Sequence, residues 1–307
     1  MTLQQIFYAI TISECGSMNK TAEMLYISQP SLTSAIKDLE KEIGITIFLR
    51  TGRGVILTRE GEEFLLYARQ LYQQYELIRQ KYVETKNIRR KFGISTQHYS
   101  FAVKAFADTV KRFDTLNYEF AIRETKTIEV IQDVGNFKSE IGLLYMNDFN
   151  RKIIKKMLKE NDCDFHKLID CKAYVYIWQK HPLAKQKSIS FDELADYPCL
   201  SFEQGENGSF YFAEEILSTN EYQRMIKATD RATMLNLMVG VNGYTLCSGI
   251  ICEELNGSDF IAVPFEADEN NPNSSMEIGY IIKKKNALSD IGKVFIEEVT
   301  GYLEGRK

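Results

Sequence analysis

The sequence has no long hydrophobic run, and its first residues do not have the pattern expected of a secretory signal. No apolar stretch among its 307 residues approaches the roughly 20 residues that cross a membrane. The N-terminus lacks the basic start of a signal peptide, and the acidic residue Glu14 soon follows the first apolar stretch. These absences predict a cytoplasmic protein with no membrane partner.

The sequence also lacks motifs for metal binding and catalysis. The 6 cysteines include no Cys-x-x-Cys pair, and the 3 histidines form no metal-ligand spacing with them. No nucleophile with an adjacent base is recognisable, and Gly205–Gly208 has too few glycines for a phosphate loop. We therefore expect no metal, no cofactor and no catalytic residue, so that the chain is not an enzyme.

Positive charge is scarce overall but gathers near the N-terminus. The net charge is −4, yet residues 1–90 hold 12 basic and 10 acidic residues, against 26 and 32 in residues 91–307. From Ile43 to Arg59 there are three arginines and no acidic residue. A basic region on an otherwise acidic protein indicates a DNA-binding surface.

Three short helices are predicted in the first 44 residues. Apolar residues at helical spacing predict a first helix that ends at Gly16, and a second over residues 19–25. Ser28 is suited to cap a third helix that ends at Gly44. The predicted buried stripe of this third helix consists of Leu32, Ile36, Leu39 and Ile43.

The opposite face of the third helix carries short polar and basic side chains. Such side chains hydrogen-bond to base edges in the major groove, and the positive end of a helix attracts phosphate. In isolation, the same pattern is also typical of a solvated helix face. The DNA-binding candidates are Lys20 on the second helix and, at the third helix, Ser28, Gln29, Pro30, Ser31, Thr33, Ser34 and Lys37.

Two short strands and a long helix follow the third helix. Residues 45–49 and 55–57 predict a β-hairpin wing, with Arg50 and Arg53 as phosphate contacts. A helix is predicted over residues 59–86, capped by Thr58. Its apolar residues alternate by four and three positions, which is typical of a dimerisation seam. The seam consists of Phe64, Ala68, Leu71, Tyr75, Ile78 and Tyr82.

Residues 1–87 resemble the LysR-type transcriptional regulator family. The resemblance rests on residues 16–25, on 28–40 and on the wing at 48–54 and 57–61, all in one register. Ser34 departs from it, since many relatives carry arginine there. The family implies a winged helix-turn-helix at 1–58, a linker and dimerisation helix at 59–90, and an effector-binding domain at 91–307. It also implies double-stranded operator DNA, a small-molecule effector, and a homodimer or homotetramer.

Beyond residue 90, predicted strands alternate with helices, which indicates an α/β fold with a mainly parallel sheet. The resemblance extends here to 181–184 and 190–194, and it implies a two-lobed domain like a periplasmic solute-binding protein. Lobe I would contain residues 91–162 and 266–307, and lobe II residues 163–265. A helix is predicted over residues 210–217.

Effector contacts are expected where strands end at the cleft between the lobes. The junction at 95–100 combines hydroxyls, an amide and an imidazole with a helix N-terminus, which suits a carboxylate, although Ser and Thr can also simply cap the helix. LysR-type regulators generally bind their effectors at this junction. The candidates are Thr96, Gln97, His98, Tyr99, Ser100, Thr125, Thr127, Tyr145, Ser201, Gln204 and Thr229. The resemblance also suggests the branch that senses sulfur amino-acid precursors.

Other functions remain as alternatives. Cys163 and Cys171 lie near the predicted lobe hinge, and some LysR-type sensors respond to peroxide through a cysteine pair. Asp162, Asp164 and Asp170 oppose this, because acidic neighbours raise a thiol pKa. A transport protein or an enzyme with the same two-lobed fold is the alternative from a different class, against which residues 1–87 argue.

Overall fold

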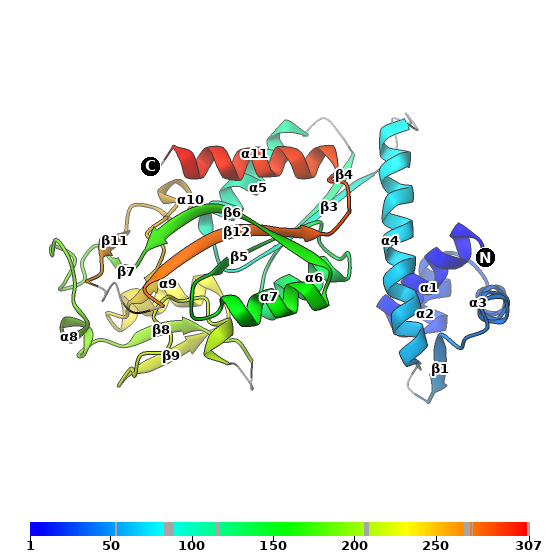
Figure 1. Cartoon of the computed structure of the whole chain (residues 1–307), viewed down its shortest axis with the longest axis horizontal. Coiled ribbons are helices and arrows are strands. Elements are labelled where there is room, and N and C mark those ends of the chain that lie inside the picture. The colour runs from blue at the N-terminus through cyan, green and yellow to red at the C-terminus, as the bar shows by residue number, and fades with distance from the viewer. Residues whose placement is uncertain are drawn as a thin grey trace. The chain divides into compact units, whose positions relative to one another are not determined.

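The structure is a computed structural model that describes residues 1–52, 54–82, 89–113, 117–205, 209–266, 271 and 273–305. The chain divides into two compact units, Met1–Ile88 and Arg89–Lys307, close to the predicted start of the sensor domain (Figure 1). Within the described residues, no helix is long and apolar enough to cross a membrane.

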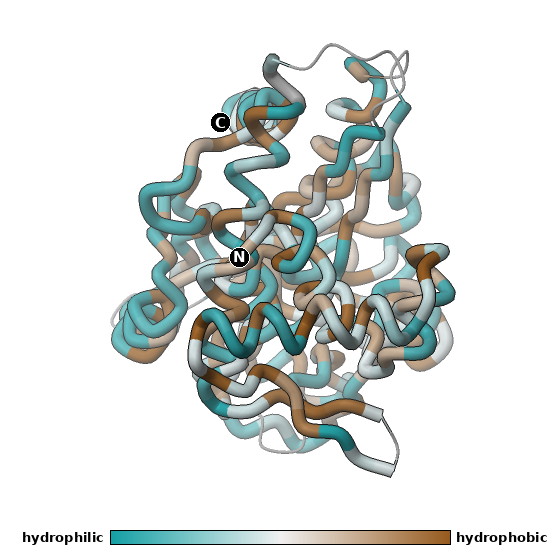
Figure 2. Tube along the Cα trace, turned by 90° about the vertical axis from the view of Figure 1, so that its right-hand side faces the viewer, coloured by the Kyte–Doolittle hydropathy of each residue, from teal (hydrophilic) through white to brown (hydrophobic). Residues whose placement is uncertain are grey.

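The first unit contains the predicted three helices, the hairpin and the long helix. Its elements are α1 (Leu3–Cys15), α2 (Met18–Met24), α3 (Gln29–Ile43), β1 (Phe48–Thr51), β2 (Gly54–Leu57) and α4 (Arg59–Tyr82). Hydrophobic and hydrophilic positions alternate along its helices (Figure 2). The apolar positions form one core, to which α3 contributes Leu32, Ile36 and Leu39.

The ends of α3 and α4 are set by local chemistry. The Ser28 hydroxyl accepts a hydrogen bond from the Ser31 backbone N–H at the start of α3, as predicted. Gly44 ends α3 with a φ of 74°, in the left-handed region that glycine adopts without strain. Thr58 caps α4 by accepting a hydrogen bond from the Gly61 N–H. The predicted extension of α4 to residue 86 lies outside the described residues.

The first lobe of the second unit is built on a five-stranded sheet. Its strands lie in the order β4 (Tyr118–Glu124), β3 (Arg90–Thr96), β5 (Ile141–Met146), β12 (Ser275–Lys283) and β6 (Cys163–Lys172). β3 pairs in parallel with β4 and β5, whereas β12 is antiparallel to its neighbours. α5 (Ser100–Arg112) and α11 (Asp290–Glu304) cover one face, and α6 (Thr127–Gly135) and α7 (Arg151–Glu160) the other (Figure 1).

The second lobe contains two small sheets. One has the antiparallel order β10 (Thr245–Cys247), β7 (Tyr174–Trp178), β11 (Phe260–Pro264). The other pairs β8 (Cys199–Phe202) in parallel with β9 (Met225–Ala228). The helices of this lobe are α8 (Phe191–Leu194), α9 (Arg231–Gly240) and α10 (Glu253–Asn256).

Two expectations about this unit need correction, and one helix was not expected. The segment 163–172 is strand β6 of the first lobe's sheet, so the chain crosses between lobes after Lys172, later than predicted at residue 163. The helix α7 was not predicted. The helix predicted over 210–217 is only a short 3-10 turn, Phe210–Phe212, because the backbone becomes extended at Ala213 and turns Glu214 and Glu215 toward a pocket.

Candidate functional site

The N-terminal half of α3 presents most of the DNA-binding candidates. Ser28, Pro30, Ser31, Ser34 and Lys37 are exposed there, and Lys20 is exposed on α2. The Gln29 Nε2 donates to the Thr33 Oγ1 at 2.8 Å, which holds the Gln29 amide along the helix face.

The wing strand β1 adds a basic side chain to the same face. The Arg50 Nη2 donates to the Thr33 Oγ1 at 3.2 Å, so Arg50 lies beside α3 while its side chain stays exposed. This contact places a guanidinium, a group suited to binding phosphate, next to the polar side chains of α3. The other predicted wing contact, Arg53, lies outside the described residues.

The predicted seam on α4 has two parts. Phe64 and Ala68 pack into the core of the first unit. Leu71, Ile78 and Tyr82 instead expose 43%, 58% and 71% of their surface. Large apolar side chains exposed at heptad spacing on one helix are suited to packing against a second copy.

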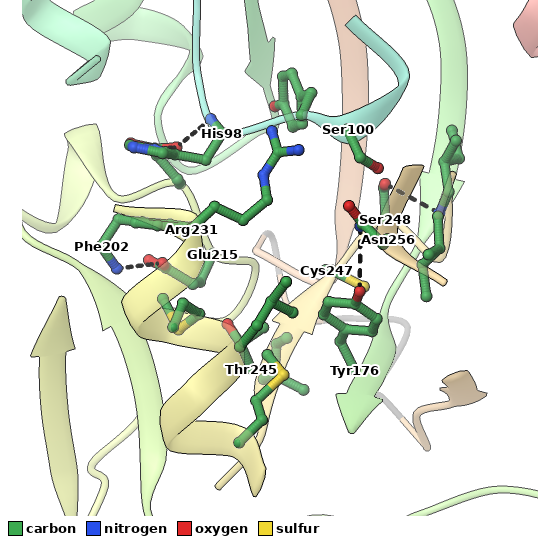
Figure 3. A pocket seen from close by; sticks show the side chains of 18 of the residues that line it. His98, Ser100, Tyr176, Phe202, Glu215, Arg231, Thr245, Cys247, Ser248 and Asn256 are labelled. Atoms are coloured by element: carbon green, nitrogen blue, oxygen red, sulfur yellow. Dashed lines mark hydrogen bonds and ion pairs between the residues drawn. The ribbon is translucent and has the colours of Figure 1, made fainter. Parts of the chain in front are cut away.

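A pocket of about 90 Å³ lies between the two lobes of the second unit. His98, Tyr99 and Ser100 contribute to it from the connection between β3 and α5. Figure 3 shows His98 and Ser100 in this position. The second lobe contributes mainly α9 and the strand and loop at 245–251, and β12 contributes Met276. Most of this lining is apolar, including Met234, Met238 and Ile251.

Of the effector candidates, only His98, Tyr99 and Ser100 line this pocket. Thr96 and Gln97 are fully buried, and their hydrogen bonds serve the framework. The Thr96 Oγ1 donates to the Gln97 carbonyl oxygen at 2.8 Å, while the Gln97 Oε1 accepts from the Tyr99 hydroxyl at 2.7 Å. These two side chains therefore shape the β3–α5 turn rather than face a ligand.

The remaining candidates lie around the pocket without lining it. Thr127 starts α6 and is buried, and the Tyr145 hydroxyl donates to the Ala213 carbonyl oxygen at 3.0 Å. Gln204 bridges the lobes, since its Oε1 accepts from the Thr127 N–H at 3.1 Å. Thr125 contacts the Glu129 carboxylate on its own helix turn. Ser201 on β8 and Thr229 after β9 are not among the lining residues.

The carboxylate that contacts the β3–α5 junction belongs to the protein itself. The Glu214 Oε2 accepts from the His98 backbone N–H at 2.8 Å and lies 2.8 Å from the His98 Nδ1. Its Oε1 accepts from the Gln204 Nε2, also at 2.8 Å. The His98 ring stacks on Phe202 with 3.8 Å between centroids. The His98 and Glu214 side chains are only 7% and 4% exposed.

Two further ionisable groups border the pocket. Burial, and then the nearby charge of Glu214, raises the pKa of Glu215 to about 8, although its Oε1 accepts from the Phe202 N–H at 2.6 Å. Burial lowers the pKa of Arg231 to about 10. Arg231 extends from the start of α9 toward His98 (Figure 3) and forms an ion pair with Glu124 at the end of β4.

The cysteine pair considered for redox sensing is not brought together. Cys163 and Cys171 lie at opposite ends of β6, and eight residues of strand span about 26 Å, whereas disulfide Cα atoms lie within about 7 Å. Burial raises the pKa of Cys163 to about 11 and that of Cys171 to about 12. Reactive thiols need the opposite shift. Among the described residues no cluster of three potential metal ligands occurs.

Two family models match the chain and cover most of it. Residues 3–62 match the bacterial regulatory helix-turn-helix protein, lysR family, and residues 96–304 match the LysR substrate binding domain. The chain belongs to the LysR family. The predicted fold class is thereby confirmed: a winged helix-turn-helix joined to a two-lobed α/β domain, in a ligand-responsive transcriptional regulator.

Individual relatives and solved structures are similar to this LysR-family chain over most of its length. An uncharacterized transcriptional regulator of Escherichia coli K12, YbhD, is 24% identical over 93% of this chain and 87% of its own length. A full-length OxyR variant from Pseudomonas aeruginosa has a TM-score of 0.67 at 17% identity, covering 99% of this chain and 95% of its own. Full-length CbnR complexed with its target DNA has a TM-score of 0.56 at 16% identity, covering 98% and 100%. Relatives named as regulators agree with the prediction of a non-enzyme.

Sequence reasoning missed the second-lobe half of the pocket. Glu214, Glu215, Arg231 and Met234 were not among the candidates. One signal was available, because two adjacent acids stand inside the apolar segment 210–217, and buried carboxylates require compensating partners.

Proposed function

We propose that this LysR-family regulator reads operator DNA with the N-terminal half of α3 and changes its DNA binding when a small molecule enters the pocket between the lobes. The observation that carries the proposal is the pocket itself, which joins the β3–α5 junction to α9 of the other lobe. A molecule in contact with both lobes favours one arrangement of them to the extent that its affinities for the two arrangements differ. Because its target is chromosomal DNA, the proposed place of action is the cytoplasm.

In this proposal the polar side chains of α3 read bases and the arginines of the wing hold phosphates. Gln29→Ala should weaken specific binding by about 1–3 kcal/mol and binding to random DNA much less. Arg50→Ala should weaken specific and random binding alike. It should also reduce the slope of log affinity against log salt concentration by roughly one unit. Fluorescence anisotropy over a range of salt concentrations measures both effects. Equal losses on specific and random DNA for Gln29→Ala would show that it does not read bases.

The effector side is tested by filling the pocket. Leu235→Trp adds a bulky ring at the pocket wall, whereas Val239→Trp adds the same ring on α9 at a residue that is 45% exposed and does not line the pocket. Small metabolites are screened with the full-length protein by thermal unfolding, and hits are retested for their effect on DNA affinity. A pocket ligand should raise the Tm of wild type and Val239→Trp but not of Leu235→Trp. Equal responses of all three proteins would place the site elsewhere.

The resemblance to sulfur-sensing regulators makes an acetylated serine one compound for this screen. Its carboxylate was expected at the β3–α5 junction, where the Glu214 carboxylate lies within 2.8 Å of the His98 N–H. Binding of this compound would therefore require Glu214 to move, which makes the compound informative whether or not it binds.

A further inference from the structure

A carboxylate of the protein itself already contacts the hydrogen-bond donors just before α5. In this family member the backbone N–H and the ring of His98 both face the Glu214 Oε2. Glu214 lies far along the chain, in the segment between β8 and β9, so this contact joins the two lobes. The bound carboxylate is nearly inaccessible to solvent, with 4% of the side chain exposed.

The other basic side chain of the pocket is not satisfied in the same way. His98 and Arg231 are the basic residues among the lining residues that the structure describes. Arg231 forms an ion pair with Glu124, but its buried Nη2 makes no hydrogen bond within the described residues. The second oxygen of Glu214 accepts from Gln204, whose own amide oxygen accepts from the first N–H of α6. The first N–H of α6 and the His98 N–H, two residues before α5, therefore already have acceptors from the second lobe.

The space that remains is small and apolar. Its volume is about 90 Å³. Methionine, leucine and isoleucine side chains form much of its wall. A charged group that enters such a space loses its hydration, and burial without a compensating partner is strongly unfavourable.

We propose that Glu214 is a tethered carboxylate that occupies the anion-binding position beside His98, so that a free ligand carboxylate is excluded from that end of the pocket. The inference rests on the pocket being the effector site. It assigns Glu214 as a specificity-determining residue: its carboxylate makes the contacts that a ligand carboxylate would otherwise make with His98.

Removing the tethered carboxylate should allow a free one to replace it. Glu214→Ala in the full-length protein deletes the carboxylate and leaves a space beside His98 that acetate can enter. Thermal unfolding is followed while sodium acetate replaces sodium chloride at constant ionic strength. The Tm of Glu214→Ala should rise with the logarithm of the acetate concentration above the dissociation constant, reaching roughly 3–5 °C at tenfold above it. Wild type should show no acetate-specific rise.

Two control variants separate this effect from general effects of the anion. Glu214→Gln fills the same space without a charge, and Glu221→Ala removes an exposed glutamate that does not line the pocket. Neither should show an acetate-specific rise in Tm. If Glu214→Ala is too unstable to purify in chloride, Glu214→Ser is measured in its place.

The outcomes are distinct. An acetate-specific rise in Tm confined to Glu214→Ala or Glu214→Ser supports the inference. No acetate-specific rise in either variant, or an equal rise in wild type or Glu214→Gln, overturns it. Because the assay uses neither DNA nor an effector, a protein that passes it but shows no ligand-dependent DNA binding would instead count against the proposed function.

Discussion

Replacing Leu71 and Ile78 with glutamate is expected to separate the protein into monomers and to weaken operator binding by roughly 10²–10⁴-fold. Both side chains are large, apolar and exposed on α4, at 43% and 58%. Charges in a helix seam oppose its association. Two linked DNA-binding units gain affinity because the second half-site is bound intramolecularly, and monomers lose this gain. Analytical ultracentrifugation and DNA titration measure the two effects.

The matched control places the same charges on another face of α4. Leu66 is 42% exposed, almost as much as Leu71, but lies outside the seam. Leu66→Glu combined with Gln70→Glu should therefore leave both the oligomeric state and the DNA affinity near the wild-type values. A wild-type protein that is already monomeric at micromolar concentration would contradict the assignment of the seam.

Stability should fall as pH rises from about 4.5 to about 8, and Glu215→Gln should remove much of this loss. The pKa of Glu215 is raised from 4.5 to about 8, first by burial and then by the charge of Glu214. Within this window the folded protein holds a proton that the unfolded chain has released, so the stabilising contribution is complete below the window and is lost through it. Each unit of pKa difference corresponds to about 1.4 kcal/mol.

Glutamine keeps an oxygen that can accept from the Phe202 N–H but cannot ionise. Chemical denaturation at several pH values should therefore show that the free energy of unfolding of the variant increases relative to that of wild type as pH rises. Glu221→Gln, at an exposed position, serves as the control and should follow wild type. Parallel pH profiles for wild type and Glu215→Gln would mean that Glu215 does not retain its proton in the folded state.

The DNA-binding unit could be predicted closely because its signals are local. Ser28 and Gly44 mark the ends of α3 through capping and a left-handed turn, which depend only on neighbouring residues. The buried stripe of Leu32, Ile36 and Leu39 follows from helical spacing. Residue identity and spacing were therefore sufficient for this part of the fold.

The sensor pocket could be predicted only in part because its contacts are long-range. His98 and Ser100 were expected from the strand-to-helix junction, and they do line the pocket. Glu214 lies 116 residues from His98, and its segment has the apolar content of a helix. Only the packing of one lobe against the other shows that its carboxylate faces the junction.

The strand β6 was missed for a related reason. Residues 163–172 mix charged and apolar side chains, because this strand lies at the edge of the sheet and exposes one side. Its position is set by antiparallel pairing with β12, which lies more than a hundred residues later. Pairing partners of this kind are not encoded in the local pattern.

The central claim, that this LysR-family chain is a sequence-specific DNA-binding regulator, is tested most directly by selection from random DNA. The full-length protein is incubated with a random duplex library at physiological salt, and bound fragments are amplified and sequenced over several rounds. The account predicts enrichment of a two-part, inverted-repeat site, and loss of that enrichment with Gln29→Ala. A wild-type pool that stays random, with binding that depends only on salt, would contradict it.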